Sequence, residues 1–572
     1  MYSLLLIKNL SVDFQSDGEI THAVNQITFE INRGETVALV GESGSGKSVT
    51  ALSILQLLPT PPALYNSGEI LFSEDRKTKT DLLHIDKRSL QKIRGNKIAM
   101  IFQEPMTSLN PVMTCGSQVM ETIRRHKKLS GKESKNEVIN WFRKVKLPKP
   151  ENIFHRYPHQ LSGGQKQRVM IAIAMCCQPS LLICDEPTTA LDVTVQKNIL
   201  QLLKDLQQQE NIGIIFITHD LGVVAEMADR AIVMHKGEIV EQNTIKEIFK
   251  NPQHPYTKAL LACRPSSQKK GTRLPVVSDF LTEMKQDKSN KNSESSLQPS
   301  DRQFSYSALI EVKNLSVWFP SKKTFLGKTT EHTKAVDEIS FEIFEGETLG
   351  LVGESGCGKT TLGRALLRLV EPTSGHIIYK KTDLVNKKRN ELRPLRKELQ
   401  IVFQDPYSSL NPRLTIGSAI TEVLKVHSPF QNYRQRKEKV IELLEKVNLE
   451  ARHFNRYPHE FSGGQRQRIV IARALSVIPS FIVCDESVSA LDVSIQAQVL
   501  NLLNDLKKEF GFTIVFISHD LSVVHYISDR IMVMNNGKIV ESGPSDDIYN
   551  NPQTEYTRQL ISSIPKGIAA GI

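Results

Sequence analysis

The sequence predicts an α/β protein made of two tandem copies of one fold, each with a mainly parallel core sheet. The first observation is repetition, because "RYPHQLSGGQKQRVMIAIA" from Arg156 returns as "RYPHEFSGGQRQRIVIARA" from Arg456, 300 residues later. "LLICDEPTTALDVTVQ" and "IIFITHDLGVV" return at the same offset as "FIVCDESVSALDVSIQ" and "IVFISHDLSVV". The second observation is that short apolar runs alternate with helix-like segments in both copies, as parallel βαβ units require.

A polar segment divides the two copies. "KQDKSNKNSESSLQPSDRQ", residues 285–303, is rich in Ser, Asn and Lys and has no aromatic residue, which is typical of a flexible linker. We therefore place the first domain at residues 1–265, the linker at 266–307 and the second domain at 308–572.

Composition and hydropathy exclude some classes of protein. With 40% hydrophobic and 24% charged residues over 572 positions, the chain has enough apolar residues for globular domains. No apolar run approaches the roughly eighteen residues of a membrane-spanning helix, and "MYSLLLIKNL" lacks the basic leader and cleavage site of a signal peptide. The net charge of +11 is spread along the chain. It permits contact with nucleic acid or an anionic membrane without demonstrating either.

The seven cysteines form no C-x-x-C pair, so we interpret them as reduced, buried or incidental thiols. Cys176 and Cys177 are adjacent, and the sequence leaves their role open.

Both copies contain a phosphate-binding loop. "GESGSGKS" (Gly41–Ser48) and "GESGCGKT" (Gly353–Thr360) fit G-x-x-x-x-G-K-[ST], and each lies between a strand-like and a helix-like segment. In such a loop the main-chain N–H groups face phosphate oxygens, the lysine reaches the outer phosphates and the last hydroxyl faces Mg²⁺. The predicted ATP-binding residues here are Gly41, Ser43, Gly44, Gly46, Lys47 and Ser48 in the first copy and Gly353, Ser355, Gly356, Gly358, Lys359, Thr360 and Thr361 in the second.

Each copy also resembles an ABC-type ATPase domain over nearly its whole length. "LSGGQ" (Leu161–Gln165) and "FSGGQ" (Phe461–Gln465) resemble the ABC signature, which in that family holds the γ-phosphate bound on the opposite domain. The resemblance implies a RecA-like α/β core with an antiparallel β subdomain and a helical subdomain. It also implies a pseudo-dimer within one chain, with two composite ATP sites, and it adds as ATP-binding residues Ser162, Gly164, Gln165, Ser462, Gly464 and Gln465.

The resemblance assigns the chemistry to matching residues in the two copies. Asp185 and Asp485 end apolar runs and are expected to face Mg²⁺, while the next residue, Glu186 or Glu486, is expected to polarise the attacking water. The other implied roles are those of the Q-loop glutamines Gln103 and Gln404, the switch histidines His219 and His519, the D-loop aspartates Asp192 and Asp492 at the domain interface, and the adenine-stacking aromatics Phe14 and Phe319. The implied metal-site residues are Ser48, Gln103, Asp185, Thr360, Gln404 and Asp485.

Neither copy lacks one of these residues, so we expect both composite sites to hydrolyse ATP. The departures from the family pattern are Phe461 in place of leucine and Ser487 in place of the proline after the catalytic glutamate.

Tandem ATPase domains of this type occur in importers and in ribosome-associated translation factors. The translation factors typically have "DEPTNHLD" and a long helix-forming linker, whereas this chain has "DEPTTALD" and Pro299 in its linker. A DNA-repair ABC protein would show zinc-binding cysteine pairs, which are absent here. The importer interpretation is favoured, and the translation factor remains the alternative.

The segments "FQEPMTSLNP", "FQDPYSSLNP", "NPQHPYTKALL" and "NPQTEYTRQLI" resemble the ATPases of bacterial dipeptide, oligopeptide and nickel importers. Membership implies ATP and Mg²⁺ as cofactors and two integral-membrane permease subunits whose coupling helices contact the helical subdomains. It also implies an extracytoplasmic solute-binding protein, a peripheral place at the cytoplasmic face of the inner membrane, and no nucleic-acid partner. Some members carry an iron–sulfur cluster after the first tail, but Cys263 alone offers too few ligands. Peptides are the favoured cargo, and glutathione-like peptides, nickel chelates and opine-like solutes remain open.

Overall fold

A computed structural model describes residues 3–16, 18–75, 78–104, 108–189, 191–265, 270–277, 279–280, 307–323, 329–427, 432–489 and 491–565. Within these ranges the chain forms two similar halves, each with one six-stranded and one four-stranded sheet. The tandem α/β architecture predicted from the repeats is therefore confirmed.

The six-stranded sheet of the first half is parallel except at one edge. Its strand order is β10-β9-β3-β8-β7-β6, and only the β9–β10 hairpin is antiparallel. The central strands β3, β7 and β8 are buried at every position, which explains their continuous apolar sequences. The strands are β3 (Thr36–Val40), β6 (Ile98–Ile101), β7 (Leu181–Asp185), β8 (Gly213–Ile217), β9 (Arg230–His235) and β10 (Glu238–Thr244).

Helices follow these strands and bring the predicted loops to one edge of the sheet, since ligands bind at the carboxyl ends of parallel strands. The helices are α1 (Lys47–Ile54) after β3, α2 (Lys87–Ile93), α7 (Gly163–Met175) before β7, α8 (Val193–Glu210), α9 (Leu221–Met227), α10 (Ile245–Lys250) and α11 (Pro255–Ala262).

Two smaller subdomains complete the first half, as the ABC resemblance implies. The antiparallel sheet has the order β2-β1-β4-β5 and consists of β1 (Ser3–Ser16), β2 (Glu19–Asn32), β4 (Ala63–Phe72) and β5 (Thr80–Asp81). The helical subdomain consists of α4 (Cys115–Lys127), α5 (Gly131–Lys144), α6 (Pro150–Phe154) and the 3₁₀ helix η1 (Pro158–Gln160). Trp141 and Phe142 are fully buried in its core.

The second half repeats this plan with the sheet orders β16-β17-β18-β13-β19-β20 and β12-β11-β14-β15. Its strands are β11 (Ala308–Lys323), β12 (Thr329–Phe344), β13 (Thr348–Val352), β14 (Ser374–Tyr379), β15 (Thr382–Asp383), β16 (Leu399–Val402), β17 (Phe481–Asp485), β18 (Thr513–Ile517), β19 (Arg530–Asn535) and β20 (Lys538–Pro544). Its helices are α13 (Lys359–Leu366), α14 (Arg389–Leu392), η3 (Pro394–Lys397), α15 (Ile416–His427), α16 (Tyr433–Lys446), η4 (Ala451–Asn455), η5 (Pro458–Glu460), α17 (Gly463–Leu475), α18 (Val493–Phe510), α19 (Leu521–Ile527), α20 (Ser545–Asn550) and α21 (Glu555–Ser562).

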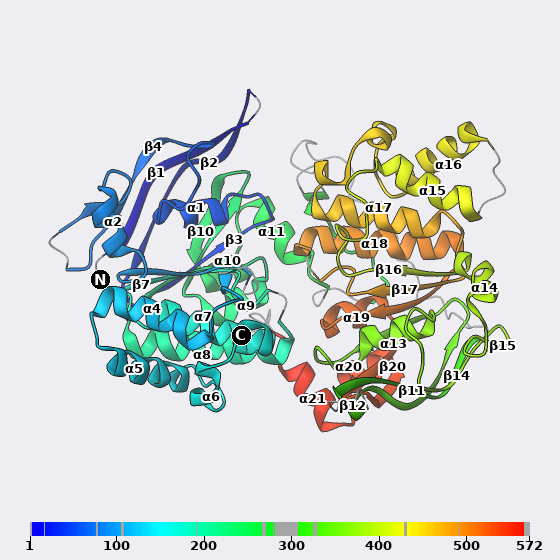
Figure 1. The fold of residues 1–572 in the computed structure, drawn as a ribbon. Helices are drawn as coiled ribbons and strands as arrows, with labels where there is room; N and C mark the ends of the chain where they lie inside the picture. The colour runs from blue at the N-terminus through cyan, green and yellow to red at the C-terminus, as the bar shows by residue number, and fades with distance from the viewer. Residues whose placement is uncertain are drawn as a thin grey trace.

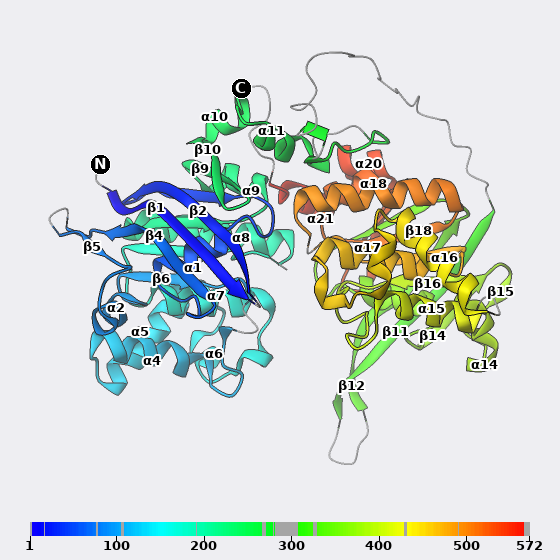
Figure 2. The same ribbon diagram turned by 90° about the horizontal axis from the view of Figure 1, so that it is seen from above.

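The two halves lie side by side in opposite orientations. In Figure 1 the antiparallel sheet of the first half is at the top and its helical layer at the bottom, whereas the second half has the reverse order. Figure 2 shows the same pair from above, with the first half's tail helix α11 close to α18 of the second half. This head-to-tail arrangement is the one that composite sites require.

Part of the predicted linker is packed against the second half. Leu274 is fully buried and Val277 nearly so, and both belong to a hydrophobic cluster that includes residues of α18 and α19. The expectation that 266–307 is a spacer throughout is therefore corrected for residues 271–277. The polar stretch 285–303 lies outside the described residues.

No helix among the described residues has the length and hydropathy needed to cross a membrane. All seven cysteines are buried, and the thiols of Cys176 and Cys177 lie 4.0 Å apart without a disulfide bond.

Candidate ATP sites

The two phosphate loops have the same internal geometry. Lys47 Nζ donates hydrogen bonds of 2.8 Å to the main-chain oxygens of Gly41 and Glu42, and Lys359 makes the equivalent bonds to Gly353 and Glu354. Lys47 is 5% exposed, and burial lowers its pKa even though nearby carboxylates act in the opposite direction. The loop thus holds a buried ammonium group at the start of α1, where a phosphate would be stabilised.

The last glycine of the first phosphate loop lies close to a neighbouring strand. Gly46, the N-cap of α1, has φ of 100°, a backbone conformation that glycine adopts readily. A Cβ atom there would come within 2.6 Å of the carbonyl oxygen of Ala23. Glycine is therefore required for the strand, loop and helix to meet at this distance.

A hydroxyl and a carboxylate meet in each half at the predicted metal position. Ser48 Oγ donates a 3.0 Å hydrogen bond to Asp185 at the end of β7, and Thr360 Oγ1 donates a 2.8 Å bond to Asp485. Burial raises the pKa of both aspartates, and Asp485 also lies 3.9 Å from the guanidinium group of Arg364. A buried carboxylate beside a hydroxyl suits a hard divalent cation such as Mg²⁺.

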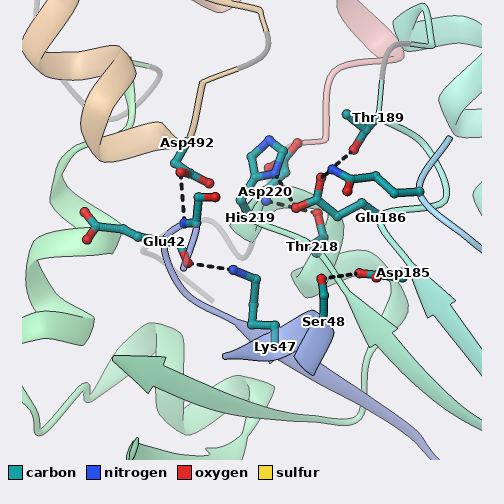
Figure 3. A network of polar contacts seen from close by, with 12 residues as sticks. Glu42, Lys47, Ser48, Asp185, Glu186, Thr189, Thr218, His219, Asp220 and Asp492 are labelled. Atoms are coloured by element: carbon teal, nitrogen blue, oxygen red, sulfur yellow. Dashed lines mark hydrogen bonds and ion pairs between the residues drawn. The ribbon is translucent and has the colours of Figure 1, made fainter. Parts of the chain in front are cut away.

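Glu186 lies in a polar network that Figure 3 shows from close by. Its carboxylate accepts hydrogen bonds from Gln103 Nε2 at 2.9 Å and Thr189 Oγ1 at 2.9 Å, and it lies 3.1 Å from His219 Nδ1. Burial alone would raise the pKa of Glu186, but the hydrogen bond and charge of His219 lower it to about 2. The pKa of His219 is raised, because Glu186 outweighs the effect of burial. Glu186 is therefore held as a carboxylate.

The second half repeats part of this network, without a counterpart of the Thr189 hydrogen bond among the described residues. Gln404 Nε2 donates a 2.8 Å hydrogen bond to Glu486, whereas His519 Nδ1 lies 3.7 Å from the Glu486 carboxylate. Glu186 and Glu486 have φ of 46° and 48°, a left-handed conformation that is uncommon for glutamate and clusters at functional sites. The two predicted catalytic glutamates therefore share one backbone conformation.

The D-loop of each half contacts the phosphate loop of the other half. Asp492 Oδ2 accepts a 2.9 Å hydrogen bond from the main-chain N–H of Ser43, and Asp192 Oδ1 accepts one of 2.5 Å from Ser355 N–H. Each aspartate is the N-cap of its helix, α18 or α8, yet neither side chain makes a capping bond. The carboxylates instead bind the phosphate loop of the opposite half, as the head-to-tail prediction requires.

Residues just after these aspartates also form hydrogen bonds with the phosphate loop of the opposite half. Thr194 Oγ1 donates a 2.6 Å hydrogen bond to Glu354, and Ser494 Oγ donates one to Glu42. Sequence reasoning missed these four residues. The signal was available, because Glu42 and Glu354 occupy the same place in the two loops, and Thr194 and Ser494 the same place after the D-loops.

The signature motifs form helix starts. Ser162 caps α7, with the Gln165 N–H donating to its Oγ and the Ser162 N–H donating to Gln165 Oε1. Ser462 and Gln465 form the same capping box at α17. Both serines are exposed. In the part of the chain that the structure describes, no hydrogen bond joins either serine to the opposite phosphate loop, so their predicted contact with bound ATP stays a prediction.

The predicted adenine-stacking aromatics lie on the outer ends of long strands. Phe14 is half-buried on β1 and packs partly against the first half's core, while Phe319 on β11 is 42% exposed. The ring of Phe319 is thus accessible to a ligand. Phe14 packs partly against the core, so it has a structural role in addition to its predicted contact with adenine.

A tyrosine from each C-terminal tail also supports the phosphate loop, a contact that sequence reasoning missed although both tail motifs contain the tyrosine. Tyr256 on α11 is fully buried, and its hydroxyl accepts a 3.0 Å hydrogen bond from the main-chain N–H of Glu42. Tyr556 on α21 accepts the equivalent 3.1 Å bond from Glu354. Burial raises the pKa of Tyr556 to about 12, so this hydroxyl remains neutral at physiological pH.

Comparison with known families agrees with this geometry. The model of the ABC transporter family matches residues 24–189 and 336–489, and that of the oligopeptide/dipeptide transporter C-terminal region matches residues 240–288 and 540–569. The second match covers both tails with their loop-binding tyrosines.

Two relatives and one solved structure illustrate the similarity. The glutathione import ATP-binding protein GsiA of Pectobacterium atrosepticum is 48% identical over 98% of this chain and 89% of its own length, and that of Escherichia coli K12 is 47% identical over 98% and 90%. The dimeric bacterial ABC transporter cassette MJ0796 aligns with 41% of this chain and 98% of its own, with 28% identity and a TM-score of 0.38. The chain belongs to the ABC transporter family, as an importer ATP-binding protein with two ATPase domains in tandem.

Proposed function

We propose that this protein uses ATP hydrolysis at two composite sites to drive the import of glutathione or a closely related short peptide. The observation that carries the two-site proposal is the reciprocal contact of Asp192 and Asp492 with the opposite phosphate loops. The cargo rests on the 47–48% identity with glutathione import ATP-binding proteins along almost the whole chain. Glutathione is a tripeptide, so this cargo falls within the peptide class that the sequence favoured.

Each residue of the first site has a distinct task in this proposal. The loop N–H groups and Lys47 bind the β- and γ-phosphates of ATP, and Ser48 and Asp185 hold Mg²⁺, which would neutralise charge on those phosphates. Glu186, ionised and fixed by Gln103, orients the attacking water and accepts its proton. His219 lies beside Glu186, where it can turn towards the γ-phosphate.

The second half supplies the other side of this site. Asp492 fixes the phosphate loop, and Ser462 with the following N–H groups binds the γ-phosphate once the halves close. Ser462 is exposed at the start of α17, so its hydroxyl is accessible to a phosphate. The second site uses Lys359, Thr360, Asp485, Glu486 and His519 with Asp192 and Ser162 of the first half.

Transport follows from closure and opening of the two halves. Two integral-membrane permease subunits contact the helical subdomains through cytoplasmic coupling helices, and a solute-binding protein delivers the cargo on the outer side. The protein acts at the cytoplasmic face of the inner membrane as a peripheral subunit. The closely packed helical subdomains, with Trp141 and Phe142 fully buried, can transmit such a movement as rigid units.

A pull-down tests this assembly. The tagged Glu186→Gln/Glu486→Gln protein is recovered from detergent-solubilised membranes with ATP present, and co-purifying proteins are identified. We expect two multi-span permeases, and recovery of ribosomes instead would favour the translation-factor alternative.

Proteoliposomes that contain the recovered complex and its binding protein are then tested for ATP-dependent uptake of labelled glutathione. Uptake of a larger peptide or a nickel chelate in preference to glutathione would overturn the cargo proposal.

A further inference from the structure

The segment after the first ATPase domain runs onto the second half. Residues 271–277, here called the strap, follow α11 and lie against α18 and α19. Leu274 is 0% exposed and Val277 7% exposed, although both belong to a segment of the sequence "KKGTRLPVV" that resembles a surface loop. The apolar side chains of this segment therefore lie in a hydrophobic cluster that both halves share.

The second half recognises the main chain of the strap as well as its side chains. Asn501 of α18 accepts a 3.0 Å hydrogen bond from the Leu274 N–H through Oδ1 and donates a 2.8 Å bond to the Leu274 oxygen through Nδ2. The Tyr526 hydroxyl of α19 donates a 2.8 Å bond to the Thr272 oxygen. Arg273 adds an exposed ion pair with Asp505 at 3.1 Å. A segment outside regular secondary structure that is held by a bidentate amide and packs into an apolar cluster has the form of a bound peptide.

The binding site is specific to the second half. Asn501 and Tyr526 are each 4% exposed, and these buried polar groups use the strap as their hydrogen-bond partner. The equivalent residues of the first half are Gln201 and Glu226, 300 positions earlier. Both are exposed, and Gln201 donates to its neighbour Asp205 at 2.7 Å. Burying Asn501 or Tyr526 without the strap would cost free energy, so these residues fit a docked segment and their counterparts do not.

The strap also connects to the ATP site through one helix. Asn501 is nine residues from Asp492 on the same helix α18, or about 13 Å along its axis. Asp492 contacts the phosphate loop of the first half. The strap therefore fastens the tail of the first half to the helix that presents the D-loop aspartate to that half. Its hydrogen bonds and ion pair with the second half go to Asn501, Tyr526 and Asp505, which lie on α18 and α19.

We propose that the strap is a docking segment that keeps the two halves paired without nucleotide. Its partner is the α18–α19 surface of the second half, and the differences at positions 201 and 226 prevent two first halves from pairing through it. When the composite sites open, the D-loop contacts can then break while the halves stay together. The proposal depends neither on the cargo nor on hydrolysis.

A cleavable version of the full chain tests this proposal. A protease recognition sequence replaces residues 289–295, the folded protein is cut, and the two pieces are studied by size-exclusion chromatography with light scattering in EDTA without nucleotide. We expect the cut protein to elute as one complex with the 64.4 kDa mass of the intact chain. Separation of the wild-type pieces at micromolar concentration would overturn the proposal.

Variants then test whether the strap causes the pairing of the two cut pieces. Leu274→Asp should weaken pairing on the order of a hundredfold, because a buried leucine is lost and a charge would be buried. The cut pieces of this variant should therefore separate. Val112→Asp, at a position 79% exposed on the first half, is the control and should remain paired. Persistence of the Leu274→Asp complex would contradict the proposal.

A second pair of variants tests the docking surface independently of the strap sequence. Asn501→Ala should promote dissociation of the cut protein, and Gln201→Ala, the matched change in the first half, should leave it paired. Circular dichroism of the uncut proteins establishes that each variant is folded. Equal effects of the two alanine variants would show that the asymmetry between positions 201 and 501 has no role in pairing.

Discussion

Asp492 of the second half lies 2.9 Å from the main-chain nitrogen of Ser43 in the phosphate loop of the first half, 449 positions earlier in the chain. Asp192 and Ser355 form the reciprocal contact. Because each aspartate leaves its own helix uncapped, the two contacts link the halves at the expense of local helix stabilisation. Each ATP site therefore contains a group from the opposite half.

Replacing one D-loop aspartate should impair both ATP binding and its turnover at the opposite phosphate loop. Asp492→Ala leaves the Ser43 N–H without its acceptor, and we expect kcat for ATP to fall roughly tenfold, the equivalent of losing one charge-assisted hydrogen bond. Steady-state ATPase assays measure this effect. Asp205→Ala, which removes a half-exposed aspartate paired with Lys146, is the control. If both variants lose activity equally, the cross-half contact is not important for hydrolysis.

Removing Mg²⁺, or the carboxylates predicted to bind it, should abolish ATP hydrolysis and leave ATP binding intact. Asp185 and Asp485 are buried carboxylates beside Ser48 and Thr360, so we expect EDTA to abolish ATPase activity and added Mg²⁺ to restore it. The Asp185→Asn/Asp485→Asn protein should stay inactive at any Mg²⁺ concentration while it still binds a fluorescent ATP analogue in EDTA. Full activity of this variant would exclude the predicted metal site.

The tail tyrosines should affect the phosphate loops without touching ATP. Tyr256→Phe removes the acceptor for the Glu42 N–H inside a buried contact, which costs about 1–3 kcal/mol of loop stabilisation. We expect weaker ATP binding in a fluorescence titration, with Tyr556→Phe giving the matched effect at the second loop. Tyr433→Phe, at a position 60% exposed, should bind ATP normally. Unchanged affinity in both tail variants would mean that the hydroxyls have no role in shaping the loops.

The local motifs were predictable from the sequence because each is a short pattern with its own geometry. The phosphate loops, the Ser48–Asp185 pair and the Glu186–Gln103–His219 network all occur where strand, loop and helix were expected. The repeat offset also predicted two halves.

The contacts between distant segments could not be predicted in the same way. Tyr256 is a single aromatic in a helical tail, and nothing in its neighbourhood indicates a bond to a loop 214 positions earlier. Leu274 lies in the sequence "KKGTRLPVV", which does not indicate that its main chain binds Asn501, 227 positions later. The first contact depends on how the tail packs against its own half, and the second on how the two halves are placed together.

The most direct test of two active composite sites compares ATP hydrolysis by the wild type, Glu186→Gln, Glu486→Gln and the double variant under identical conditions with Mg²⁺. Both glutamates have the same strained backbone and the same glutamine partner. We expect each single variant to lose at least about half of the activity, and the double variant to lose essentially all of it while retaining two ATP per chain. If Glu186→Gln abolished turnover while Glu486→Gln had no effect, hydrolysis would occur at one site only, which would contradict two active composite sites.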